Sequence, residues 1–190
     1  GIETINDFFT ADLAKRICEK KGRVKIVTAT NVVAHLDDLH GLCEGVKSLL
    51  DEKGAFIVEF PYLVDLLNNN EFDTIYHEHL SYFAIRPLIN LFKQHEMYIF
   101  DIERLSIHGG SVRLYIAKDG AGYKQFKIFK NILKEEFLKK LDTRYPYDNF
   151  AKRVKIVKRD LVKLLRKLCS QGKIIAGYGA AAKGNVLLNY

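Results

Sequence analysis

The chain has 190 residues, a formal net charge of +7 and 48% hydrophobic residues, a composition that can bury a core and that excludes disordered and low-complexity proteins. No apolar run approaches the roughly 18 residues of a membrane span, and no signal-peptide pattern opens the chain, so we expect no membrane partner and a cytoplasmic location. The cysteines Cys18, Cys43 and Cys169 are far apart and form no CxxC pair. This argues against a disulfide framework or a zinc site within this chain and predicts reduced, mostly buried thiols.

Helices and strands alternate in the first part of the chain. The strands are marked by clusters of β-branched residues and the helices by apolar spacings of three and four. Two alternating segments joined by a short link then predict an antiparallel hairpin at the edge of an otherwise parallel sheet. The predicted elements are a helix at 6–21, a strand at 24–29, a helix at 39–50, a strand at 55–60, helices at 61–67 and 86–96, and hairpin strands at 98–105 and 112–117.

The second part of the chain is helical and basic. Residues 118–173 hold 17 basic and 6 acidic residues, a net charge of +11, and the remainder carries −4. Helices are predicted at 123–141 and from Asp148 or Asn149 to Ser170, with a break at 145–147 between them. Lysines on a long helix usually form its solvated face, although they could also meet a nucleic acid or another polyanion.

A short apolar strand is predicted at 173–178, followed by a turn of small residues at 177–185 that enters a helix. This arrangement is that of the first strand and turn of a second doubly wound unit, where backbone N–H groups and Lys183 can meet a phosphate. Glycines at such a turn serve as often to pack a helix on a strand.

The densest polar cluster lies at residues 72–83. A histidine paired with a carboxylate is what a general base near neutral pH requires, and His79 with Glu78 supplies such a pair. Tyr76 could donate a hydrogen bond to a developing enolate oxygen. A metal site is an alternative, but His77 and His79 lack the HExxH spacing. A structural role, in which the polar groups tie a loop down, is a further alternative.

Two more clusters follow strands or join them. Thr30, Asn31 and His35 come directly after the strand at 24–29, where ligands bind in open α/β sheets, although a capped helix start would have the same pattern. In the hairpin link, His108 and Ser111 flank two glycines that permit positive φ angles or a close approach of ligand. A simple Gly-Gly turn is the alternative.

Six segments together resemble the sugar-nucleotide C-methyltransferases, which use S-adenosylmethionine to methylate C3 of a nucleotide-linked 4-ketodeoxysugar. These segments span nearly the whole chain in the order of the family. They are GIETINDFFT, TATNVVAHLDDL, GAFIVEFPYLVDLL, FDTIYHEHLSYF, SIHGGSVRLYI and GYGAAAKGNVLLNY.

The resemblance implies an α/β fold: the second half of a class I methyltransferase (Rossmann-like) sheet in residues 1–118, a basic helical connector in 119–172 and the start of a second Rossmann-like domain in 173–190. It further implies that a zinc domain and the glycine-rich cofactor strand precede this chain in family members, and that most of the second Rossmann-like domain follows it. No metal is expected in this chain itself.

The resemblance also implies roles for single residues. His79 would be the base, held by Glu78, with Tyr76 steadying the enolate and the substrate. S-adenosylmethionine would be bordered by Thr30, Asn31 and His35. The nucleotide-linked sugar would contact His108, Ser111, Gly179, Lys183 and Asn185.

A second hypothesis is a non-catalytic module that docks its basic helices on nucleic acid or another anionic partner. Nucleic acid is the less favoured partner, because the basic segment lacks the stacking aromatics with interleaved arginines of a single-strand binder.

Overall fold

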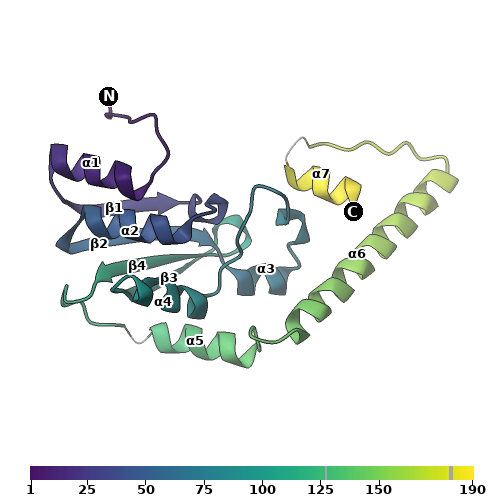
Figure 1. Ribbon diagram of the computed structural model, residues 1–190. Coiled ribbons are helices and arrows are strands. Elements are labelled where there is room, and N and C mark those ends of the chain that lie inside the picture. Colours follow the sequence, from purple (N-terminus) through teal and green to yellow (C-terminus); the bar gives the residue numbers. More distant parts are fainter. Residues whose placement is uncertain (127, 180–181) are drawn as a thin grey trace.

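The computed structural model describes residues 1–126, 128–179 and 182–190. Within them, helices surround one mixed four-stranded sheet (Figure 1). The strands are β1 (Val24–Thr30), β2 (Leu50–Pro61), β3 (Met97–Leu105) and β4 (Ser111–Lys118). The α-helices are α1 (Ala11–Lys21), α2 (Leu39–Leu49), α3 (Leu63–Asn69), α4 (Ile85–Gln94), α5 (Ile128–Leu138), α6 (Tyr145–Ser170) and α7 (Ala182–Asn189), and short 3-10 turns are η1 (Val33–His35), η2 (Phe72–Thr74) and η3 (Ile107–Gly109).

The strand order is β1-β2-β4-β3. β1 pairs with β2 in parallel, whereas β4 is antiparallel to both β2 and β3. Three strands therefore run in one direction, and β4 is inserted between two of them in the opposite direction. The predicted α/β class and the predicted antiparallel hairpin are both confirmed.

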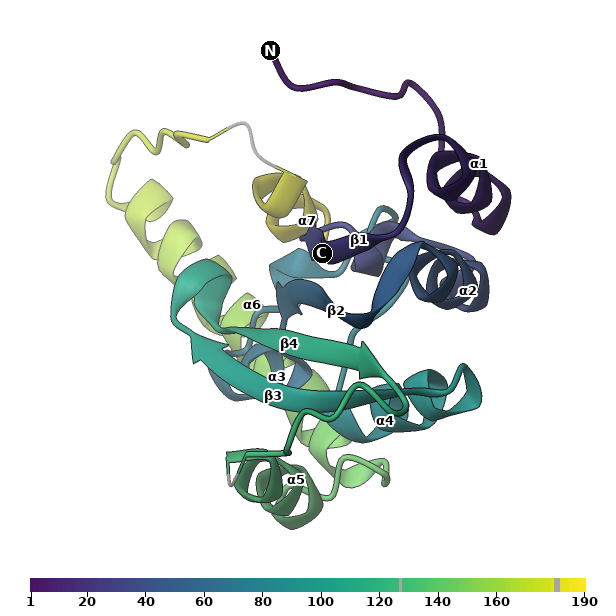
Figure 2. The same ribbon diagram turned by 90° about the vertical axis from the view of Figure 1, so that its left-hand side faces the viewer.

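The core lies on the face of the sheet that α2 and α4 cover (Figure 2). Phe56 and Phe60 of β2 are buried there, and the Phe56 ring meets Phe92 of α4 edge-on at 6.5 Å between ring centroids. On the opposite face of β2 and β4, Arg113 pairs with Glu59 at 2.8 Å. The face of β2 that carries Phe56, Val58 and Phe60 therefore holds the packed core, whereas Glu59 lies on the other face.

Capping side chains fix where two helices begin. Thr10 accepts a hydrogen bond from Leu13 N at 3.1 Å, so α1 begins at Ala11 and not at residue 6 as predicted. Asp38 accepts one from Gly41 N at 2.7 Å and starts α2. Each side chain satisfies a backbone donor that the first helical turn leaves free.

Residues 123–126 are not helical, although a helix was predicted from 123 to 141. The Tyr123 ring stacks on Phe100 of β3, with ring centroids 4.4 Å apart, and the Gln125 amide donates to Ile99 O at 2.9 Å. These contacts hold the segment against β3, so tertiary contacts override its helical periodicity. The predicted helix also includes Lys127, which lies outside the described residues.

A buried carboxylate joins α5 to the rest of the domain. Glu136 is only 3% exposed and accepts three hydrogen bonds: from Tyr62 Oη at 2.8 Å, Ile85 N at 2.6 Å and Arg86 N at 3.1 Å. The two backbone donors belong to the first turn of α4, where the helix dipole favours a negative charge. Burial and the Glu136 carboxylate raise the pKa of Tyr62, so its hydroxyl stays protonated and donates.

α6 extends away from the sheet, and α7 returns toward η2 (Figure 1). α6 begins at Tyr145, earlier than predicted, because Pro146 is tolerated in a first helical turn. The strand predicted at 173–178 is wrong: these residues have no regular structure, and Ile174 is 98% exposed with no neighbouring strand to pair with. Among the helices that the structure describes, none is both long and apolar enough to cross a membrane.

The three thiols differ in exposure: Cys43 is buried, Cys18 is partly exposed and Cys169 is exposed. The prediction of mostly buried thiols therefore holds only for Cys43. Desolvation, with smaller contributions from the charges of Glu44 and Asp38, raises the pKa of Cys43 to about 12.

We expect alkylation at pH 8 to modify Cys169 rapidly and Cys43 only after unfolding, because the thiolate is the reactive form. Peptide mass spectrometry after timed exposure to iodoacetamide measures both rates. Equal labelling of Cys43 and Cys169 in the folded protein would contradict the burial of Cys43.

Candidate functional site

The first part of the site is the turn that ends β1. Asn31 has a φ of 53° and donates its backbone N–H to Glu59 O of β2 at 2.9 Å, which bends the chain out of the sheet. Thr30 and His35 on either side of the bend are exposed. The Oδ1 atom of Asn31 is buried and has no hydrogen-bond partner among the described residues. A buried acceptor without a donor is costly, and a ligand at this edge of the sheet could supply the donor.

The second part is the loop between η2 and α4, which is fixed to the first part by backbone hydrogen bonds. Leu80 N and Ser81 N both donate to Ala34 O of η1, at 2.9 and 3.2 Å. Further along, Phe83 forms a parallel bridge with Tyr62 at the end of β2. The loop is therefore held against the carboxyl ends of β1 and β2.

His79 lies at the centre of this loop. Its Nδ1 atom is 2.7 Å from the carbonyl oxygen of Thr74, and its Nε2 atom is 3.4 Å from Tyr76 Oη. A carbonyl oxygen only accepts hydrogen bonds, so Nδ1 carries the proton of the neutral ring. Nε2 then carries the lone pair, and among the described residues the Tyr76 hydroxyl is its hydrogen-bond neighbour.

The carboxylate that was predicted to hold His79 is not its partner. His79 N donates to Tyr76 O at 3.1 Å, and this turn brings Nδ1 to the Thr74 carbonyl. Glu78 is exposed, and no hydrogen bond joins it to His79 among the described residues. A backbone carbonyl thus does what the sequence assigned to Glu78.

The structure brings two of the predicted clusters together. The rings of His35 and His79 lie 4.9 Å apart between centroids, and the Tyr76 ring lies 4.4 Å from His79 on the same measure. His35 was predicted as a cofactor contact and His79 as the base, so one site holds both. Thr74 and Tyr82, which also contact His79, were not singled out by the sequence although both lie within the polar cluster.

The hairpin turn lies against the end of α3. His108 is exposed at the tip with a φ of 52°. Its contact with a ligand stays a prediction. Ser111 differs from the prediction: it is fully buried, and its hydroxyl donates to Ile107 O at 3.2 Å, so it closes the turn instead of facing a substrate. Asn69 of α3 holds the turn by donating to Gly109 O at 2.7 Å.

Replacing Gly110 with Ala is expected to destabilise the protein by about 2–4 kcal/mol, since a Cβ at its φ of 131° is strained and would meet a close neighbour. That Cβ would lie 2.4 Å from Asp65 Oδ2 and 2.5 Å from Asp65 Cβ, which cannot swing aside. Gly120→Ala is the control, because Gly120 has a positive φ but open space around it. Urea unfolding measures both, and equal losses for the two variants would contradict the predicted clash.

The remaining predicted substrate contacts surround α7. Gly179, Lys183 and Asn185 are all exposed, and the side chain of Asn185 accepts a hydrogen bond from Asn189. α7 lies beside η2, and the Tyr190 ring that follows it packs on Phe72 at 5.5 Å between centroids. The predicted turn at 177–185 includes Ala180 and Ala181, which lie outside the described residues.

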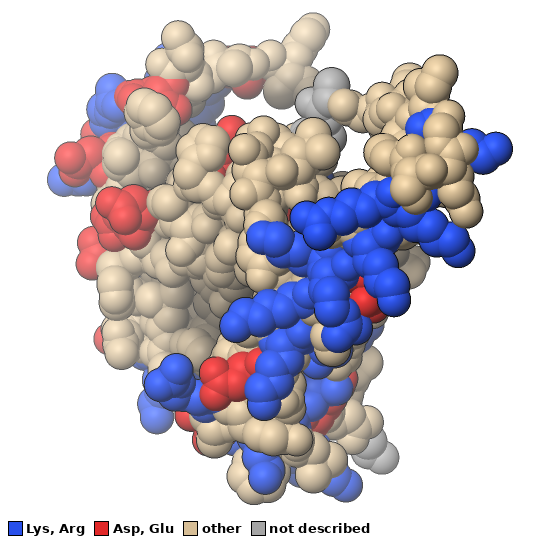
Figure 3. All heavy atoms as spheres, turned by 90° about the vertical axis from the view of Figure 1, so that its right-hand side faces the viewer, with Lys and Arg blue, Asp and Glu red and all other residues tan. Residues whose placement is uncertain are grey.

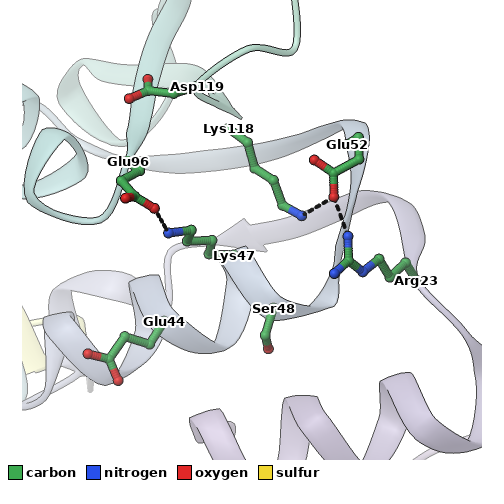
Figure 4. A pocket seen from close by; sticks show the side chains of 8 residues that line it. All are labelled: Arg23, Glu44, Lys47, Ser48, Glu52, Glu96, Lys118 and Asp119. Atoms are coloured by element: carbon green, nitrogen blue, oxygen red, sulfur yellow. Dashed lines mark hydrogen bonds and ion pairs between the residues drawn. The ribbon is translucent and has the colours of Figure 1, made fainter.

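A polar hollow of about 640 Å³ lies at the other end of the sheet, near the amino ends of β1 and β3 (Figure 4). Its charges pair with one another: Glu52 with Arg23 and Lys118, and Lys47 with Glu96. None of the residues that the sequence predicted for the site lines this hollow. In the described ranges, no three His, Cys, Asp or Glu side chains gather to hold a metal ion.

Comparison with known proteins relates the chain to one class of enzyme. Residues 106–190 match the family described as the C-methyltransferase C-terminal domain. The C-methyltransferase NovU from Streptomyces niveus is 38% identical over 188 residues, which are 99% of this chain and 45% of NovU. The chain is thus similar to this C-methyltransferase over nearly its own whole length. It spans less than half the length of NovU, and the family match begins before the predicted boundary at residue 118, so the three-part division remains a prediction.

Two solved structures are similar to part of this chain. A SAM-dependent methyltransferase from Anabaena variabilis is 15% identical with a TM-score of 0.47, over 60% of this chain and 57% of that one. The magnesium protoporphyrin IX methyltransferase ChlM from Synechocystis is 13% identical with a TM-score of 0.41, over 51% of this chain and 46% of that one. The fold assignment rests on the strand order and not on these partial likenesses.

Proposed function

We propose that the protein transfers a methyl group from S-adenosylmethionine to the carbon next to the ketone of a nucleotide-linked ketodeoxysugar, with His79 as the base. The observation that carries this proposal is the hydrogen bond from His79 Nδ1 to the Thr74 carbonyl at 2.7 Å, which leaves the Nε2 lone pair to accept a proton. The relation to NovU supports the class of reaction.

His79 would remove the proton from the carbon beside the ketone and hold it on Nε2. The Thr74 carbonyl would keep the ring in one tautomer during this step, since it accepts from Nδ1 before and after Nε2 is protonated. Tyr76 would donate its hydroxyl proton in a hydrogen bond to the enolate oxygen. General-base catalysis of this kind typically contributes about 10²- to 10⁴-fold.

The end of β1 fits S-adenosylmethionine, which when bound supplies the electrophilic methyl group. The unpartnered Asn31 Oδ1 could accept a hydrogen bond from an amino group of this cofactor. Thr30 and His35 flank Asn31 and are exposed to a ligand. His35 would contact both the cofactor and the base, because its ring lies 4.9 Å from that of His79.

The nucleotide-linked sugar is proposed to contact His108 at the hairpin turn and the segment of Gly179, Lys183 and Asn185. Lys183 would meet the diphosphate, which its positive charge suits. Support comes from the packing of Tyr190, which follows α7, on Phe72 of η2, four residues before Tyr76. The cytoplasmic location stays a prediction.

The test uses the complete gene product. Calorimetry measures S-adenosylmethionine binding, and mass spectrometry measures whether a nucleotide-linked 4-ketodeoxysugar gains one CH₂ in its presence. We expect binding and a methylated product. Binding without product on any such sugar would contradict the proposed substrate, and no binding would contradict the proposed cofactor.

A second candidate function has one observation in its favour. Lys and Arg side chains form a band along α6 (Figure 3), where Lys155, Lys158, Lys163 and Arg166 line a groove of about 480 Å³. This band could dock on nucleic acid. A gel shift of RNA or DNA that weakens with salt would support this candidate, and no shift at physiological ionic strength would remove it.

A further inference from the structure

Tyr82 contacts the carbonyl oxygen of Thr74, the same atom that holds Nδ1 of His79. Its ring stands at 89° to the imidazole, with centroids 6.2 Å apart, and its hydroxyl lies 3.4 Å from the Thr74 carbonyl oxygen. Thr74 is itself buried, and its Oγ1 donates to Glu71 O at 2.7 Å. The carbonyl is therefore fixed, and the Tyr82 ring forms a wall beside the imidazole that this carbonyl holds.

The backbone on both sides of Tyr82 is held. On one side, Ser81 N donates to Ala34 O at 3.2 Å. On the other side, Phe83 O accepts a hydrogen bond from Leu63 N at 3.0 Å. Tyr82 is therefore anchored to η1 on one side and to the end of β2 on the other. The backbone that carries the ring is therefore fixed beside His79, and the hydroxyl contact with Thr74 O at 3.4 Å holds the ring itself.

Tyr82 also lines a cavity of about 220 Å³. Leu141, Asp142 and Tyr147 from the chain between α5 and α6 line the same cavity. Burial raises the pKa of both Tyr82 and Tyr147, so both hydroxyls are protonated near neutral pH. Tyr147 donates to Leu141 O at 2.8 Å. Among the described residues no hydrogen bond or ring contact joins it to His79, which makes it a matched control.

We propose that Tyr82 is a positioning residue for His79: its ring confines the imidazole in the orientation in which Nδ1 donates to Thr74 O and Nε2 faces the substrate. This inference rests on the proposed function for its catalytic consequence. Without the wall, the ring can turn about its side-chain bonds and water can reach the Thr74 carbonyl. A displacement of about 1 Å at a reacting group can cost on the order of 10²-fold in rate.

The test compares Tyr82→Leu, Tyr82→Phe and Tyr147→Phe in the complete gene product. Steady-state kinetics give kcat and KM on the nucleotide-linked ketosugar, and long-range ¹H–¹⁵N spectra of the histidine side chains give the tautomer of His79. For Tyr82→Leu we expect a kcat loss of about 10- to 10²-fold with an unchanged KM for S-adenosylmethionine, and a mixed tautomer at His79. Tyr82→Phe keeps the ring and should recover most of kcat, while Tyr147→Phe should match the wild type.

An unchanged kcat and an unchanged His79 tautomer in Tyr82→Leu would overturn the inference. An Nε2–H tautomer of His79 in the wild type would overturn it as well, and that measurement uses the wild type alone. If the wild type shows no turnover but Tyr82→Leu still mixes the tautomers, the positioning role stands and the proposed function fails. If the wild type turns over and Tyr82→Leu is normal in both readouts, only the positioning role fails.

Discussion

Replacing His79 with Asn is expected to lower methyl transfer by about 10²- to 10⁴-fold, the usual contribution of a general base. The Asn amide nitrogen can take the place of Nδ1 and still donate to the Thr74 carbonyl, which His79 meets at 2.7 Å. Only the basic Nε2 atom is lost. Single-turnover kinetics on the nucleotide-linked ketosugar, with calorimetry of S-adenosylmethionine, measure rate and binding separately.

His77→Asn is the matched control, because His77 is an exposed histidine two residues away in the same loop. We expect its rate and its affinity for S-adenosylmethionine to remain near the wild-type values. A His79→Asn variant that retains wild-type turnover would remove His79 from the role of base. Equal losses in both variants would point to damage to the loop in place of lost chemistry.

Replacing Glu136 with Ala is expected to destabilise the protein by about 3–5 kcal/mol, since it leaves several buried donors without an acceptor. These donors are Tyr62 Oη, Ile85 N and Arg86 N. Glu136→Gln keeps one acceptor oxygen but replaces the other with an NH₂ group, which cannot accept a hydrogen bond. We therefore expect an intermediate loss of stability. Urea unfolding of each variant gives the free energies of unfolding.

Glu135→Ala provides the control on the adjacent residue. Glu135 is partly exposed and pairs with Arg104 at 3.1 Å, and such a pair contributes about 1 kcal/mol or less. If Glu136→Ala and Glu135→Ala unfold at the same urea concentration, Glu136 does not anchor α5 to the first turn of α4 as the structure indicates.

The parts of the fold that depend on local pattern could be predicted from the sequence. The β-branched clusters gave β1, and alternation gave the hairpin of β3 and β4, because side-chain periodicity reports which face of a strand is buried. The prediction failed at 123–126, where Tyr123 stacks on Phe100, and at 173–178, where an apolar run has no strand beside it. Both outcomes depend on what the segment meets in three dimensions.

The candidate site was predicted in the same uneven way. The residue types in the polar cluster pointed to His79, and the edge of the sheet pointed to His35, but the contact between the two rings follows from hydrogen bonds to Ala34 O. The prediction of Glu78 as the partner of His79 was wrong, because a contact with a backbone carbonyl such as that of Thr74 has no signature in the sequence. Glu136 was missed for a related reason, since an acidic residue in a lysine-rich helix looks like part of a solvated face.

In the proposed mechanism, His79 removes the proton next to the ketone. Hydrogen–deuterium exchange at that carbon measures this step, followed by NMR in D₂O with the complete gene product and S-adenosylhomocysteine, so that no methyl group can be transferred. We expect exchange with the wild type and with His77→Asn, and none above background with His79→Asn. Exchange at the wild-type rate in His79→Asn would show that another group removes the proton.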